Sequence, residues 1–271
     1  MEVMCSTSVR TRCDLEEALR FISSLGYDKA DMVMVDGWVH INPTDLVRDF
    51  KGTIARVEWL FSRYGVYPWS CDMGTSMQLH ERSAELDAQR VRETKAVVDF
   101  CRYFGIKIAG IQPKAKIWDG VWEEYVDRCV QSVREMKEVG DASGVNMIVE
   151  LHVNSPFETL DQCAYLAEKI PDLQYAYDAS HFVMQGYDIR ETEWILRKAA
   201  HIHLRDSAKG RMQTPFGEGT MDFDWLLGKL REIGYGAHFS LEFLEYRDDE
   251  KGDLASDIKN MHAKLREYFD V

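Results

Sequence analysis

The sequence lacks the features that mark membrane-spanning and secreted proteins. No run of residues approaches the roughly 18 apolar positions that a membrane-spanning helix needs. The first residues, MEVMCSTS, contain no basic region followed by an apolar run, so they do not resemble a signal peptide. None of the 6 cysteines forms a CxxC pair, which favours reduced thiols. We therefore expect a cytoplasmic protein that does not associate with a membrane.

Basic residues are also scarce. Lysine and arginine total 33 against 46 aspartate and glutamate residues, and the formal net charge is −13. A protein that binds a nucleic acid duplex needs clustered cations to replace the counterions of the phosphates. The charge balance therefore argues against a nucleic-acid partner. The hydrophobic fraction of 45% still supplies ample material for a large core.

The GxGxxG signature of dinucleotide-binding folds is missing after the first predicted strand. The chain instead alternates short apolar or β-branched runs with longer segments of helical period. Strands are predicted at 2–6, 32–35, 66–70, 106–111, 146–151, 173–177, 200–204 and 237–244. Helices are predicted at 14–25, 45–64, 83–104, 121–139, 157–169, 191–199, 222–233 and 253–269.

This alternation predicts the fold class. The runs DMVMV and NMIVEL are almost continuously apolar, as parallel strands buried on both faces are. Strict alternation of strand and helix with short connections favours a parallel α/β sheet. Eight such units in 271 residues favour closure into a barrel. We expect an α/β protein with a single (β/α)8 TIM barrel over residues 1–271. An open doubly wound sheet is the alternative.

Polar side chains stand where the later predicted strands end. Glu150, Asp178, His203 and Glu242 follow apolar residues in strands five to eight. The carboxyl ends of these strands meet at the mouth of a TIM barrel, where active sites are built. Each residue alone is typical of a solvated or hydrogen-bonded strand end, but three carboxylates buried together require a cation. Their oxygen and nitrogen atoms suit one divalent ion: manganese, cobalt, magnesium or zinc.

These residues carry a family resemblance. The order is a Glu on strand five, Asp-x-x-His on strand six, a His on strand seven and a Glu on strand eight. This order resembles the xylose isomerase-like TIM barrels, and within them the sugar isomerases and epimerases that include D-tagatose and D-psicose 3-epimerases. The resemblance implies that Glu150, Asp178, His203 and Glu242 are the metal ligands. It also implies that His181 contacts the substrate.

One position departs from the family pattern. Lys209 replaces a family arginine six residues after the strand-seven histidine, and Arg205 and Arg211 are nearby substitutes for its contact with substrate. The endonuclease branch of the same superfamily uses extra ligands from its early strands. The corresponding segments here, MVMVDGWVH and VYPWSCDM, do not clearly supply them. The pattern therefore favours the sugar enzymes.

Further side chains are predicted at the mouth. Three tryptophans and a histidine follow the predicted strands two, three and four: Trp38, His40, Trp69 and Trp118. Their rings either pack on the C–H surfaces of a sugar or cap the barrel without touching substrate. Gln112 follows strand four and either donates a hydrogen bond to a hydroxyl group or belongs to a solvated loop.

The ligand set predicts one common intermediate. A metal ion that holds a carbonyl and a neighbouring hydroxyl oxygen stabilises an enediolate, with Glu150 and Glu242 as catalytic base and acid. We expect a sugar isomerase or epimerase acting on an unphosphorylated keto sugar or polyol-derived ketone. A metal-dependent lyase, either a dehydratase or a keto-glycoside eliminase, is the alternative. A non-catalytic sugar-binding barrel is a third hypothesis. The expected partner is a small carbohydrate, and a homo-oligomer is compatible with the sequence.

Overall fold

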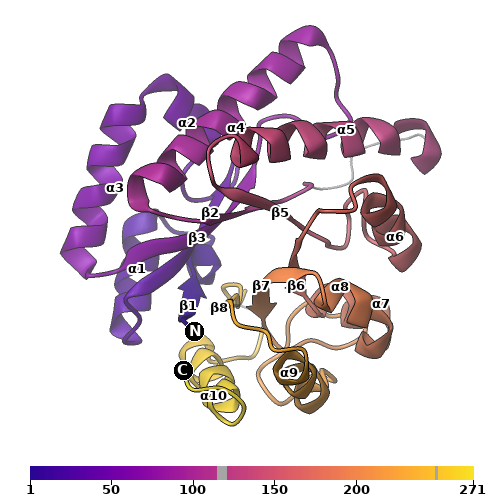
Figure 1. Ribbon diagram of the computed structural model, residues 1–271. Helices are drawn as coiled ribbons and strands as arrows, with labels where there is room; N and C mark the ends of the chain where they lie inside the picture. The colour runs from indigo at the N-terminus through magenta and orange to yellow at the C-terminus, as the bar shows by residue number, and fades with distance from the viewer. Residues whose placement is uncertain (115–120, 248–249) are drawn as a thin grey trace.

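The computed structural model describes residues 1–114, 121–247 and 250–271, which fold as a closed barrel of parallel strands inside a layer of helices (Figure 1). The strands pair in chain order, and the barrel closes where Val3 of β1 lies beside Phe239 of β8. This closure confirms the predicted (β/α)8 TIM barrel and excludes the open sheet. The strands are β1 (Val3–Ser6), β2 (Lys29–Val35), β3 (Tyr67–Gly74), β4 (Ile108–Ile111), β5 (Asn146–Glu150), β6 (Tyr175–Asp178), β7 (Ala199–Leu204) and β8 (His238–Leu241).

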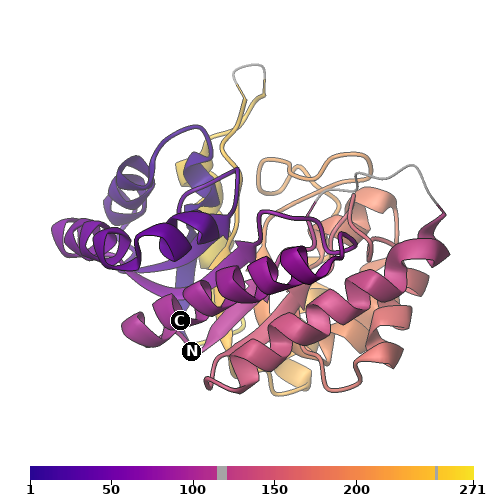
Figure 2. The same cartoon turned by 90° about the horizontal axis from the view of Figure 1, so that it is seen from above.

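Helices follow the strands around the barrel. Figure 2 shows the connections after β7 and β8 on the same side of the molecule, the mouth of the barrel. Within the described ranges, no helix combines the length and the apolar character needed to cross a membrane. The α-helices are α1 (Leu15–Ser24), α2 (Pro43–Arg48), α3 (Phe50–Tyr64), α4 (Ala84–Phe104), α5 (Trp122–Asp141), α6 (Leu160–Lys169), α7 (Ser180–Gln185), α8 (Glu193–Leu196), α9 (Phe223–Glu232) and α10 (Leu254–Arg266). Two 3-10 helices, η1 (Thr7–Arg10) and η2 (Ile189–Thr192), complete the set.

The helix that the sequence predicted at 45–64 is two helices, α2 and α3. Asp49 separates them, because its backbone leaves the helical region at φ −148° and ψ 79°. Its side chain accepts a hydrogen bond from the backbone N–H of Gly52 at 2.9 Å and so caps α3. A Cβ on Gly52 would lie 2.1 Å from the Asp49 carboxylate, so glycine is required for this cap.

Strand β3 is longer than the sequence predicted, ending at Gly74 instead of Ser70. Its polar residues face the inside of the barrel. Cys71 points to the helix layer, where its Sγ lies 3.5 Å from Sγ of Cys101 on α4. Its neighbours Ser70 and Asp72 therefore face inward, and both are buried. A strand with polar residues on its inner face resembles a loop in sequence, because its apolar residues are few. This explains why the prediction ended the strand too early.

Asp72 fits inside the barrel because the neighbouring residue of β4 is glycine. Gly110 lies beside Asp72 in the β3–β4 register. A Cβ at Gly110 would lie 2.0 Å from Asp72 Oδ1, well inside van der Waals contact. The missing side chain on β4 therefore provides the space for a carboxyl group on β3.

We predict that Gly110→Ala lowers the free energy of unfolding by about 1–3 kcal/mol, because it overpacks this site. The measurement is chemical denaturation monitored by circular dichroism. Combining it with Asp72→Ala should recover part of this loss, since the overlap is then removed, and a double-mutant cycle would show a coupling. Simple additivity of the two substitutions would mean that Asp72 does not occupy the space beside Gly110.

Candidate metal centre

Four polar residues from strands five to eight converge at the mouth of the barrel. Glu150 ends β5, Asp178 ends β6, His203 lies near the end of β7, and Glu242 directly follows β8. One ligand atom from each lies within 4.8 Å of the others. His203 Nδ1 is 3.0 Å from Glu150 Oε1 and 3.1 Å from Glu242 Oε2. The four side chains are almost completely buried, so their oxygen and nitrogen atoms face one another rather than solvent.

The electrostatic balance of this cluster is visible in its pKa values. Burial alone would raise the pKa of Glu150, but hydrogen bonds to His181 and His203 outweigh burial and hold that pKa well below its usual range. Burial likewise acts to raise the pKa of Asp178, whereas the nearby Arg205 and His181 lower it overall. Burial favours neutral His203, yet the surrounding carboxylates raise its pKa. The carboxyl groups of Glu150 and Asp178 are therefore ionised at neutral pH.

Arg205 supplies a fixed positive charge at the edge of the cluster. Its Nη2 lies 2.6 Å from Asp178 Oδ2 and 3.7 Å from Glu242 Oε2, and its Nε donates to Ser180 Oγ at 2.8 Å. One arginine neutralises about one of the three carboxylates. A proton on His203 Nδ1 would neutralise a second carboxylate. That proton would occupy the same nitrogen atom that a cation would bind. The three carboxylates and one imidazole therefore fit a divalent ion of the manganese, cobalt, magnesium or zinc type.

His181 lies beside the cluster on α7, a short helix that the sequence did not indicate. Its Nε2 is 3.6 Å from Asp178 Oδ2 and 3.8 Å from Glu150 Oε1. Gln112, just after β4, donates from Nε2 to Glu150 Oε2 at 3.3 Å. The structure thus brings His181, Gln112 and Arg205 together around the expected ligands.

A small cavity of about 140 Å³ opens over these groups. It adjoins a larger groove of about 760 Å³, formed by the segments after β7 and β8, and Met212 and Leu244 line both. The cavity is smaller than the roughly 300–1,000 Å³ of sites for drug-sized ligands, so it suits a smaller molecule. Its walls are Trp38, Gln112, Glu150, His152, His181, Arg205, Met212, Glu242 and Leu244.

Other residues expected at the mouth lie elsewhere. His40 turns its Nε2 to the backbone oxygen of Arg10 at 2.9 Å and lines a separate groove. Lys209 packs against Gly186 beside another surface hollow. Trp69 lies at the opposite end of the barrel, its ring 5.7 Å from that of His238 at the start of β8. Trp118 falls outside the described residues.

Sequence reasoning missed three polar residues in and below this centre, the half-buried His152 and the buried Asp31 and Asp72. His152 lines the cavity, and its ring centroid lies 5.4 Å from that of His181 with the two rings tilted by 40°. Its Nε2 has no hydrogen-bond partner among the described residues. Its position two residues after Glu150 was the available signal. Asp31, Asp72 and His201 lie one layer deeper. The available signal for Asp31 was a single carboxylate in an otherwise apolar run, KADMVMV. Only closure of the barrel brings this residue near β7.

Comparison with known proteins agrees with this geometry. A model of the xylose isomerase-like TIM barrel family matches residues 10–265. The chain belongs to this family. The resemblance inferred from the strand-end residues is therefore confirmed at the level of the family.

Individual relatives of this xylose isomerase-like barrel are distant and differ in activity. A probable endonuclease 4 of Thermotoga sp. (strain RQ2) is 25% identical over 194 residues, covering 65% of this chain and 65% of the relative. The match therefore spans slightly less than two thirds of that protein. An inosose isomerase of Bacillus velezensis (strain DSM 23117 / BGSC 10A6 / LMG 26770 / FZB42) is 21% identical over 194 residues, covering 66% of this chain and 69% of the relative. The crystal structure of IOLI protein with a bound zinc atom has a TM-score of 0.74 and 19% identity, with 100% of both chains covered. At this identity, the structural likeness concerns the fold.

We predict that the protein binds one divalent ion per chain and that His203→Ala weakens this binding more than about 100-fold. Loss of a residue that merely supports a ligand already costs about 10- to 100-fold. Isothermal titration calorimetry with Mn²⁺ and elemental analysis after dialysis measure the affinity and the stoichiometry.

His181→Ala is the matched control, because it removes an imidazole beside the cluster but outside the four ligands. It should retain the ion. Equal metal loss from both variants would require a different ligand set, and full retention by His203→Ala would remove His203 from the centre.

Proposed function

We propose that the protein is a divalent-metal-dependent isomerase or epimerase of a small, unphosphorylated keto sugar or polyol-derived ketone. One observation carries this proposal. The carboxylates of Glu150 and Glu242 approach the same nitrogen, His203 Nδ1, at 3.0 and 3.1 Å, and both line the small cavity. They come from strands separated by two others around the barrel, so they reach a molecule in the cavity from different directions.

The side chains divide the chemistry between them. When bound to the four ligands, a divalent ion supplies Lewis-acid polarisation of a substrate carbonyl and its neighbouring hydroxyl. Glu150, ionised because its histidine neighbours lower its pKa, accepts the proton from the carbon beside the carbonyl. Glu242 holds a proton at this point and donates it from its own side of the cavity, so the two carboxyl groups exchange protonation states and exchange with solvent restores them. Return to the same carbon on the other face is epimerisation, and return to the neighbouring carbon is isomerisation.

Three further groups orient the substrate. Arg205 Nη2 lies 3.2 Å from His181 Nε2, and both residues line the cavity together with Gln112. Their N–H groups suit the hydroxyl and carbonyl oxygens of a polyol. Trp38 covers the cavity from the segment after β2 and is 47% exposed, so its ring is available to pack against the C–H face of a sugar.

The hydrogen bonds within the loop after β7 argue for an unphosphorylated substrate. TIM barrels often bind phosphate through backbone N–H groups of a glycine-rich loop in this region. Here Gly217 and Gly219 both donate their N–H groups to Asp206 Oδ2, at 2.7 and 3.1 Å. These donors are therefore already used within the protein, and Glu218 between them adds a negative charge that repels phosphate.

Two features separate the proposed activity from that of the endonuclease relatives. The formal net charge of −13 disfavours the approach of a polyanion. In the part of the chain that the structure describes, the groups able to surround a cation are the four ligands and a deeper set of Asp31, His201 and His203, which shares His203. This arrangement suits one ion at the mouth rather than several ions along a phosphate backbone.

A lyase is the second candidate, and His152 is the observation that favours it. Elimination of a β-hydroxyl needs a proton donor for the leaving oxygen in addition to the base. His152 lines the cavity, and its Nε2 has no other partner within the described ranges. Nδ1 of His152 lies 2.6 Å from the backbone oxygen of Val153 and carries the proton of the neutral ring, which burial and the neighbouring His181 favour by lowering its pKa. In a lyase, Nε2 therefore takes up a proton from solvent before it donates one to the leaving oxygen, so that His152 acts as a proton relay.

We predict that Glu150→Gln and Glu242→Gln each lower turnover by about two to four orders of magnitude, because glutamine keeps an oxygen ligand but removes the base. Proton NMR in deuterium oxide measures both the product and the exchange of the proton beside the carbonyl. With one Glu serving each face, the two variants should lose exchange from opposite epimers. Identical defects from both epimers would contradict a two-base epimerase.

His152→Asn distinguishes the two candidate functions. In an isomerase or epimerase, this change should leave turnover within about tenfold of the native protein. In a lyase, it should lower formation of the dehydrated product by about 10²- to 10⁴-fold while proton exchange continues. The same NMR experiment reports both quantities, and a change in exchange alone would argue against a proton-donor role for His152.

A further inference from the structure

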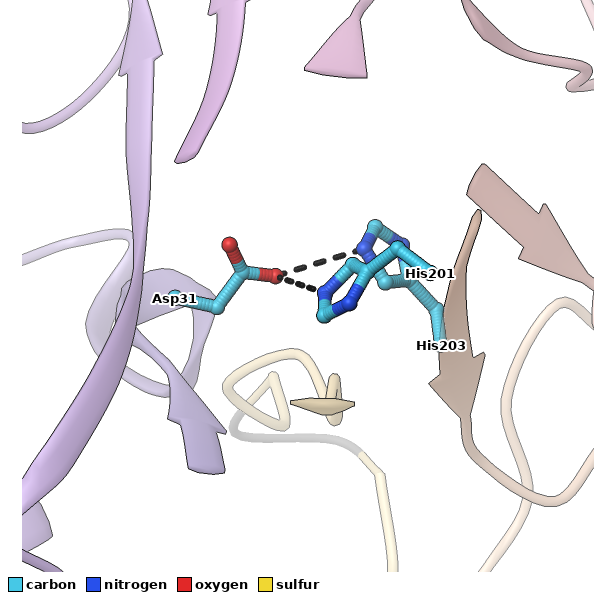
Figure 3. A group of neighbouring side chains, drawn as sticks. All are labelled: Asp31, His201 and His203. Atoms are coloured by element: carbon cyan, nitrogen blue, oxygen red, sulfur yellow. Dashed lines mark hydrogen bonds and ion pairs between the residues drawn. The ribbon is translucent and has the colours of Figure 1, made fainter. Parts of the chain in front are cut away.

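A carboxylate from the opposite wall of the barrel contacts the imidazole of His203. Asp31 lies on β2, and Figure 3 shows its side chain crossing the interior toward His201 and His203 on β7. Its Oδ2 is 3.3 Å from His203 Nε2 and 3.4 Å from His201 Nε2. All three side chains are buried, so this contact lies inside the barrel below the mouth.

The two nitrogens of His203 have different surroundings. Nδ1 faces Glu150 and Glu242, and it is the atom that belongs to the set of four ligands. A ligating nitrogen must present its lone pair, so the proton of the neutral ring is on Nε2. Nε2 points down into the barrel, where the nearest carboxylate oxygen among its ion-pair contacts is that of Asp31. The ring therefore has a metal side and an acceptor side.

We propose that Asp31 is a positioning residue that accepts the Nε2 proton of His203 and so holds Nδ1 toward the metal site. Second partners of this kind fix the orientation of a ligating imidazole and increase its basicity. Asp31 does not line the substrate cavity and is not one of the four expected ligands, so it acts only through His203. This inference depends on the metal site proposed above.

Asp31 is itself held in place from two sides. Ser70 Oγ, on β3, donates to Asp31 Oδ1 at 2.6 Å, which leaves Oδ2 for the histidines. His201 Nε2 lies 3.4 Å from both Asp31 Oδ2 and Ser70 Oγ. Strands β2, β3 and β7 thus contribute to one interior network that ends at the ligand. A carboxylate held on both oxygens has little freedom to leave His203.

Asp72 provides an internal comparison. Its Oδ2 is 3.5 Å from the same His203 nitrogen, and within the described residues neither this oxygen nor Nε2 has a hydrogen-bond partner. Asp31 is the closer of the two, at 3.3 Å from Nε2, and Ser70 Oγ donates a hydrogen bond to its other carboxylate oxygen. Both aspartates therefore lie near Nε2, and only Asp31 is anchored for the role.

A second cation bound to Asp31, His201 and His203 is the competing interpretation, because these residues can also surround an ion. His203 would then have to bridge two ions through both nitrogens and lose its remaining proton. The anchored carboxylate makes a proton on Nε2 the simpler state. The two interpretations differ in stoichiometry: positioning requires one ion per chain, and a second site requires two.

The test is Asp31→Asn, with Asp72→Asn as the matched control. Asparagine keeps the size of the side chain and an oxygen for Ser70. Titration calorimetry of the metal-free chain with Mn²⁺ should show binding weakened by about 10- to 100-fold in Asp31→Asn and by less than about threefold in Asp72→Asn. The visible absorption of the Co²⁺-loaded protein should change in Asp31→Asn, because the His203 ring is reoriented. Melting of the metal-free forms checks that both variants fold.

Each outcome bears on a separate claim. Native metal affinity and an unchanged cobalt spectrum in Asp31→Asn would overturn the positioning role, as would equal losses in both variants. Two ions in the native chain and one in Asp31→Asn would make Asp31 a ligand instead. If His203→Ala itself keeps the ion, the metal site proposed above fails, which is a result distinct from failure of the role of Asp31 alone.

Discussion

The concentration of negative charge around His203 is the constraint on which the rest of the mouth depends. Glu150, Asp178 and Glu242 are buried together, and carboxylates in such a place are stable only if cations and hydrogen bonds compensate for lost hydration. Arg205 supplies one positive charge through its 2.6 Å contact with Asp178. A divalent ion would balance the negative charge that remains. The buried carboxylates, which are costly for folding, are therefore also the groups that form the candidate site.

The barrel provides this site by orienting strand ends rather than by any local motif. Parallel strands place all their carboxyl ends on one rim, so residues distant in sequence meet there. The layer beneath is also polar. Asp31, Ser70 and Asp72 face inward, and Gly110 leaves space for the last of these. The strands of this barrel are thus apolar on the side that faces the helices and polar on the side that faces the barrel axis, where the polar network reaches His203.

The mouth combines this fixed cluster with variable surroundings. Two relatives of the same family have names that specify different activities, an endonuclease and an inosose isomerase. In this chain, the four residues of the candidate metal centre lie at the ends of strands, whereas most other residues that line the cavity lie in the connecting segments. Asp206 holds the loop after β7 through hydrogen bonds, and Trp38 and Met212 line the cavity. These connecting segments therefore shape the cavity above the four strand-end residues.

The sequence by itself determined the eight-fold alternation and the four strand-end residues, because hydrophobic period and strand polarity are local properties. It could not determine the inner face of β3, since inward-facing Ser70 and Asp72 look like loop residues until the barrel closes. Nor could it locate Trp69 and Lys209, whose directions depend on packing. The pairing of Asp31 with His203 joins residues 172 positions apart across the barrel, and only tertiary structure decides such contacts.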